Sequence, residues 1–95
     1  VRFGNCMFDV ARGELTRDGK HVRLTSLEES LLRTFALNAG GTLSREELMR
    51  ESRIDSNARA VDVQVTRLRR KIEPDPKLPR YLQTVRGAGY VLRPD

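Results

Sequence analysis

The chain has 95 residues, of which 38% are hydrophobic and 5% aromatic, so it can bury one modest core. No apolar run approaches the roughly 18 residues of a membrane span, and no basic-then-apolar start resembles a signal peptide. The single cysteine, Cys6, excludes an internal disulfide and a multi-thiolate metal site. Because the chain begins with Val1 rather than Met, we expect a processed form or a piece cut from a longer protein. These features together predict one reduced, cytoplasmic domain that spans residues 1–95.

Charge is unevenly distributed along the chain. Eighteen Lys and Arg residues against 13 Asp and Glu give a formal net charge of +5 and a pI near 10.1. Lysine occurs only at positions 20, 71 and 77, so most cations are arginines, whose forked guanidinium suits phosphates and guanine edges. Against Asp62 alone, the segment 59–71 holds Arg59, Arg67, Arg69, Arg70 and Lys71. Such a cluster is typical of nucleic-acid-binding proteins, and a merely solvated helix face is the alternative.

The N-terminal quarter of the chain predicts a small antiparallel sheet. Residues 6–10 alternate between core-type and other side chains, which is the period-two pattern of a half-buried strand. Asp18-Gly19 separates residues 14–17 from residues 21–24, and both turn residues tolerate positive φ. This segment therefore predicts a β-hairpin.

Two amphipathic helices follow, and each begins with a capping box, in which a Ser side chain and a Glu three residues later bond each other's backbone N–H. Ser26 with Glu29 predicts the first helix, and Ser44 with Glu47 predicts a shorter second one. The first helix should carry a core stripe of Leu27, Leu31, Leu32 and Phe35. Residues 42–43, between the helices, predict one brief strand.

A third helix is predicted to begin near Ser56 or Asn57 and to end at Glu73, before Pro74. At about 100° per residue, one side of this helix forms a core stripe of Val61, Val65, Leu68 and Ile72. The opposite side gathers Arg59, Val63, Thr66, Arg67 and Arg70. A valine within such a basic face suits contact with a thymine methyl group.

The C-terminal segment predicts a β-hairpin, because residues 81–85 and 90–93 have strand character and Arg86-Gly87-Ala88-Gly89 joins them tightly. The helices at 44–52 and 57–73 form a helix-turn-helix that can place its second helix in the major groove of DNA. Strands, three helices and a final hairpin, in this order, predict an α+β winged helix-turn-helix fold.

No catalytic constellation is present. The adjacent acids Glu28-Glu29 and Glu46-Glu47 each fall in the first turn of a predicted helix, where they favour the positive end of its dipole. His21 lies in a predicted hairpin, without a carboxylate or serine at a telling spacing. Residues 87–89 lack the third glycine of a dinucleotide-binding loop and precede a strand. We therefore expect no enzyme activity, no cofactor and no metal.

Three motifs resemble OmpR/PhoB-type response regulators. RAVDVQVTRLRRKIE (residues 59–73) resembles their recognition helix, YLQTVRGAGYVL (81–92) their C-terminal hairpin or wing, and LTSLEESLL (24–32) the start of their first helix. Pro79-Arg80-Tyr81 is closer to the OmpR branch. The resemblance implies a cytoplasmic DNA-binding output domain that follows a phosphorylatable receiver domain in a two-component phosphorelay and regulates transcription. The receiver is absent from this chain.

The resemblance also implies roles for individual residues. Arg67 would contact base edges in the major groove, and Val63 would touch a thymine methyl. Arg86 matches the wing position that enters the minor groove in some members. The implied contacts to the DNA backbone are Arg59, Gln64, Arg69, Arg70, Thr84 and Tyr90.

The implied partners are duplex DNA, a second copy in tandem on DNA, and RNA polymerase. Family members often contact the polymerase through the segment matching residues 51–58, which is short here and lacks the usual aromatic. A basic RNA-binding or ribosome-associated module is the main alternative, although RNA readers usually expose aromatic platforms. A protein-interaction winged helix with a solvated basic face is a third.

Overall fold

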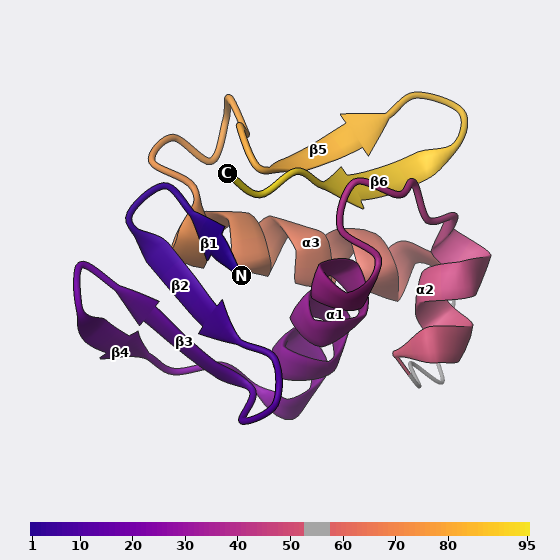
Figure 1. Cartoon of the computed structure of the whole chain (residues 1–95). Coiled ribbons are helices and arrows are strands. Elements are labelled where there is room, and N and C mark those ends of the chain that lie inside the picture. The colour runs from indigo at the N-terminus through magenta and orange to yellow at the C-terminus, as the bar shows by residue number, and fades with distance from the viewer. Residues whose placement is uncertain (53–57) are drawn as a thin grey trace.

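The computed structural model describes residues 1–52 and 58–95 and has the predicted α+β architecture (Figure 1). The chain opens with an antiparallel sheet of strands β1 (Arg2–Phe3), β2 (Cys6–Asp9), β3 (Glu14–Arg17) and β4 (Lys20–Val22) in sequential order. The helices that follow are α1 (Ser26–Leu37), α2 (Arg45–Glu51) and α3 (Ala58–Ile72). The chain ends with an antiparallel hairpin, called the wing, of β5 (Leu82–Val85) and β6 (Gly89–Leu92).

The N-terminal sheet forms as its alternating pattern predicts. Cys6 and Phe8 are at most 1% exposed, whereas Met7 between them is 46% exposed. Asp18 and Gly19 adopt φ angles of +54° and +79°, so they form the predicted turn between β3 and β4. The sheet therefore presents one apolar face to the core.

The capping box of α1 lies one residue earlier than predicted. The N-cap is Thr25 rather than Ser26: Glu28 N–H donates to Thr25 Oγ1 (3.2 Å), and Thr25 N–H donates to Glu28 Oε1 (2.8 Å). With Thr25 as the N-cap, the Glu28 side chain faces inward and is 2% exposed. Leu27, which was predicted to be a core residue, is instead 41% exposed. Glu28 can turn inward because Lys71 of α3 pairs with it.

The second helix is confirmed, whereas the brief strand predicted at residues 42–43 is reduced to a single β-bridge at Leu43. Ser44 and Glu47 form the predicted capping box of α2. Leu43 makes an isolated β-bridge to Tyr90, in which the N–H of each residue donates to the carbonyl of the other (2.8 and 2.9 Å). This bridge joins the segment before α2 to the wing.

The core stripe of α3 is also confirmed, since Val61, Val65, Leu68 and Ile72 are at most 1% exposed. The predicted start at Ser56 or Asn57 lies outside the described residues. Just after α3, the carboxylate of Glu73 is buried and accepts the backbone N–H groups of Arg80, Tyr81 and Leu82. Glu73 thus fixes where β5 begins relative to the helix.

Helix α3 runs between α1 and the wing, and α2 lies beside one end of it (Figure 1). At the other end, Arg17 of β3 donates to the carbonyls of Lys71 (3.1 Å) and Glu73 (3.2 Å). The N–H of Asp95 donates to the carbonyl of Arg2 (3.0 Å), so the chain returns to β1. These contacts hold α3 and leave one of its sides uncovered.

Candidate nucleic-acid interface

One side of α3 is exposed along its length and carries Arg59, Val63, Thr66, Arg67 and Arg70, as its periodicity predicts. Val63 is 44% exposed. No hydrogen bond or ion pair joins Arg67 or Arg70 to another described residue. Both guanidinium groups are therefore available to an external ligand.

The tip of the wing is a tight turn that exposes Arg86. The N–H of Ala88 donates to the carbonyl of Val85 (2.9 Å), and Gly87 has a φ of +76°, the positive value that the third position of a type II turn requires. An ion pair with a carboxylate such as Asp62 or Glu73 would be the alternative role for Arg86, but both carboxylates accept hydrogen bonds from other groups. Within the described part of the chain, Arg86 has no ion-pair partner.

Gly89 begins β6 at a point of close backbone approach. Its φ is +143°, and a Cβ at this position would overlap the carbonyl oxygen of Leu43. Glycine tolerates this positive φ, and the need for glycine here is also steric. The absence of a side chain allows the wing to pack against the segment that leads into α2.

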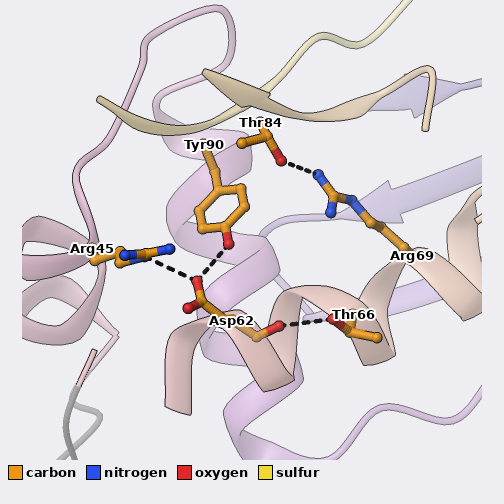
Figure 2. Close-up of polar contacts among 6 residues, drawn as sticks. All are labelled: Arg45, Asp62, Thr66, Arg69, Thr84 and Tyr90. Carbon is orange, nitrogen blue, oxygen red and sulfur yellow. Dashed lines mark hydrogen bonds and ion pairs between the residues drawn. The ribbon is translucent and has the colours of Figure 1, made fainter. Parts of the chain in front are cut away.

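Arg69 of α3 is directed at the wing. Its Nε donates to the carbonyl of Leu82 (3.0 Å), and its Nη2 donates to Thr84 Oγ1 (2.9 Å) (Figure 2). Its guanidinium carbon lies 5.6 Å from the ring centroid of Tyr90, within the range of a cation–π contact. Thr84 and Tyr90 oppose each other across the two wing strands, so Arg69 contacts both strands.

Asp62 of α3 makes a second connection to the wing. Its Oδ1 accepts hydrogen bonds from the Tyr90 hydroxyl (2.5 Å) and from Arg45 Nε of α2 (3.0 Å) (Figure 2). Burial raises the pKa of Tyr90, and the hydrogen bond to Asp62 and the Asp62 charge raise it further. The hydroxyl therefore remains a hydrogen-bond donor at neutral pH.

Several residues predicted to contact the DNA backbone have internal roles in the free domain. Gln64 is only 7% exposed, and its Oε1 has no hydrogen-bond partner among the described residues. Tyr90 is also 7% exposed. Thr84 is exposed, and because its oxygen accepts from Arg69, its own hydroxyl hydrogen remains available. The contacts of these residues with DNA therefore stay predictions.

Lys71, part of the basic cluster in the sequence, points away from the exposed side of α3. Its Nζ donates to Glu28 Oε1 and to the carbonyl of Arg23, both at 2.6 Å. Burial alone would raise the pKa of Glu28, but hydrogen bonds from Lys71 and Thr25 and the Lys71 charge outweigh it and lower the pKa. The pair therefore stays ionised and joins α3 to α1.

Sequence reasoning missed Arg45 as a member of this site. Its partner Asp62 lies 17 residues further along the chain, so no local pattern indicates the contact. One signal was present, since Asp62 is the only acid in the basic segment 59–71. A single acid among arginines indicates a specific internal partner.

Other kinds of site find little support in the part of the chain that the structure describes. There, no group of three or more His, Cys, Asp or Glu side chains could hold a metal ion. No helix among these residues is long and apolar enough to cross a bilayer. His21 is exposed and Cys6 is buried.

A helix with an exposed arginine-rich side, braced against a β-hairpin, defines the class of winged helix-turn-helix domains. The family described as "Transcriptional regulatory protein, C terminal" matches residues 19–92. The chain belongs to this family, the DNA-binding output domains of OmpR/PhoB-type response regulators.

Relatives and solved structures agree with this assignment. The chain is 54% identical to protein PetR of Rhodobacter capsulatus, over all of this chain and 44% of PetR. It is 40% identical to the regulatory protein VirG of Agrobacterium fabrum, over 85% of this chain and 33% of VirG. The chain thus spans less than half the length of these curated relatives.

Two solved structures show the same fold. The response regulator DrrB of Thermotoga maritima, an OmpR/PhoB homolog, matches with a TM-score of 0.88 and 34% identity, over 98% of this chain and 43% of DrrB. The DNA-binding domain of RstA from Klebsiella pneumoniae, in complex with the RstA box, matches with a TM-score of 0.85 and 30% identity, over 100% and 97% of the two chains. The predicted winged helix-turn-helix fold is therefore confirmed.

Proposed function

We propose that this domain binds a specific duplex DNA sequence through α3 and the wing, and so directs transcription at particular promoters. The observation that carries the proposal is the exposed side of α3, where Arg67 and Arg70 have no partner among the described residues. Such a helix fits the major groove, and the wing attached to it can reach an adjacent groove. Membership of the family supports the same function.

The proposed division of labour follows the exposure of each residue. Arg67 contacts base edges, with guanine as the preferred partner, and Val63 contacts a thymine methyl. Arg59, Arg70 and the Thr84 hydroxyl contact phosphates, which position the protein without reading the sequence. Arg86 enters the minor groove.

Partners beyond DNA are proposed on the basis of the relatives. Because those proteins are more than twice as long, we propose that a receiver domain precedes this domain in the full protein, which acts in the cytoplasm. A second copy would bind in tandem on the operator. The predicted polymerase contact at residues 51–58 falls mostly outside the described residues. We assign the domain no enzyme activity and no cofactor.

The burial of the aromatic side chains argues further against the RNA-binding alternative. All five aromatic side chains are buried, with Tyr81 and Tyr90 at 7% exposure and the three phenylalanines at 0%. Stacking of unpaired bases requires exposed rings. An RNA-binding role would therefore depend on charge alone.

Selection of binding sites from a random duplex library, followed by titration, tests the proposed function. The selected duplex should bind much more tightly than a scrambled duplex of the same composition, typically by 10³-fold or more. An RNA hairpin of equal charge serves as the control. Equal affinity for all three ligands would contradict the proposal and leave only electrostatic binding.

A further inference from the structure

We propose that Arg69 is a positioning residue that fixes the wing relative to α3, and that with Asp62 it sets the spacing at which the domain reads two grooves. This inference rests on the proposed function. It differs from the role predicted for Arg69 from the sequence, which was a phosphate contact. The two roles have separable consequences.

In addition to Glu73, which fixes the start of β5, two residues within α3 bond the wing at separate points. Asp62 accepts from the Tyr90 hydroxyl, and Arg69 bonds Leu82 and Thr84. The two α3 residues are seven positions apart, which is about 10 Å along a helix. Two attachments at this distance prevent the hairpin from pivoting about either one.

Arg69 uses its fork on acceptors within the protein. Nε and Nη2 each have an acceptor within 3.0 Å, and the guanidinium contacts the Tyr90 ring. Arg70, the next residue, is exposed and has no partner among the described residues. Adjacent arginines on one helix thus have different surroundings, and only Arg70 is free to bind a phosphate without breaking internal hydrogen bonds.

The tip of the wing lies beyond these attachments. Arg86 is two residues further along than Thr84, in the turn that connects β5 to β6. A small tilt of the strands beyond their packed base would displace this tip further than the residues near the base. Arg69 therefore determines where Arg86 lies relative to Arg67.

The base of the wing has additional support, so the variants should fold. Leu82 and Leu92 are 0% exposed, and the Leu43 bridge holds Tyr90 through the backbone. Loss of the Arg69 fork should free the tip of the wing while its base remains packed. Arg69→Lys is the sharpest variant, because it keeps the charge but cannot donate to two acceptors in the same planar geometry.

The experiment compares two versions of the selected operator, in which an A·T tract beside the major-groove site is left in place or moved by one inserted base pair. The insertion shifts the tract by about 3.4 Å. Wild type should lose roughly tenfold in affinity on the shifted operator, within the range of one mismatched base pair. Arg69→Lys should lose much less on shifting, with an unchanged dependence on salt.

Two further variants test the same geometry without changing charge. Thr84→Val removes one acceptor of Arg69, and Tyr90→Phe removes the hydrogen bond to Asp62. Both should relax the spacing preference in the same direction as Arg69→Lys. Arg70→Gln is the matched control: it should weaken both operators equally and reduce the salt slope by about one.

Amide hydrogen exchange in the free domain gives a readout that does not depend on DNA. Exchange of the Ala88 N–H should be faster in Arg69→Lys than in wild type and unchanged in Arg70→Gln. Unchanged exchange, or a spacing preference equal to that of wild type, would overturn the inference. If wild type binds no duplex selectively, the proposed function fails, and the exchange result alone decides whether Arg69 holds the wing.

Discussion

Lys71 and Glu28 form an ion pair with 2.6 Å between Nζ and Oε1, which joins α3 to the first turn of α1. The Glu28 side chain is 2% exposed, whereas the Lys71 side chain is 30% exposed. The pair removes one cation from the basic cluster of α3 and uses it to hold the helix in place. The proposed DNA-binding surface is consequently smaller, and more strictly arginine, than the composition of the helix suggests.

The affinity for duplex DNA should fall steeply with salt. The exposed cations Arg59, Arg67, Arg70 and Arg86 bring four positive charges to the DNA, and three or four neutralised phosphates should give log affinity against log salt a slope of roughly −2.7 to −3.6. Fluorescence anisotropy over a series of KCl concentrations measures this slope. A slope near zero would contradict the assignment of this surface. Lys71→Met should leave the slope unchanged.

Arg67 and Arg70 should contribute to DNA binding in different ways, one to sequence discrimination and the other to overall affinity. Arg67→Ala should cost on the order of 1–3 kcal/mol and relax discrimination at one base pair, because the fork that reads a base edge is lost. Arg70→Ala should weaken good and poor sites by the same factor, because a phosphate contact carries no sequence information. Titration against single-base operator variants separates them. Equal loss of discrimination in both proteins would show that the roles are assigned wrongly.

Arg86 should respond to the width of the minor groove. The narrow groove of an A·T tract has an enhanced negative potential that attracts an inserted guanidinium. Arg86→Ala should therefore lose most affinity on operators with A·T flanks and little on those with G·C flanks. Arg86→Lys should recover only part of the loss, because its ammonium is more strongly hydrated. If Arg86→Ala binds both flanks as wild type does, the wing does not read the groove.

Gly89→Ala should destabilise the domain more than Gly87→Ala. Both glycines have positive φ, so each substitution costs about 1–2 kcal/mol in backbone strain. A Cβ on Gly87 would meet no atom within 4 Å, whereas one on Gly89 would overlap the Leu43 carbonyl. Urea denaturation of the two variants measures the difference. Equal losses would mean that the backbone at Leu43 moves aside without cost.

The stabilising effect of Glu28 should depend on pH in the acid range. Because the pKa of Glu28 is lowered in the folded state, the charged carboxylate stabilises the domain above its ordinary pKa, and this contribution is lost as the pH falls through the lowered value. Glu28→Gln keeps a capping side chain but not the charge. Its deficit in unfolding free energy should be full at pH 7 and shrink on acidification. A deficit independent of pH would contradict the role of the charge.

Local chemistry was enough to predict much of the fold. The stripe of Val61, Val65 and Leu68, the Asp18-Gly19 turn and the capping box at Ser44 depend on residues close together in sequence. Periodicity also predicted which side of α3 is exposed, because the side opposite a buried stripe must face solvent. The motifs of α3 and the wing were sufficient to identify the family.

The tertiary structure decided what happens at the borders of that exposed side. Arg69, Arg70 and Lys71 are consecutive cations, yet one holds the wing, one is exposed and one pairs with Glu28. Glu28, the partner of Lys71, also completes the capping box of α1 with Thr25, one residue earlier than predicted. A helical wheel gives the direction of each side chain but not what lies there. The partners come from segments 13 to 48 residues away, and only packing brings them within hydrogen-bond distance.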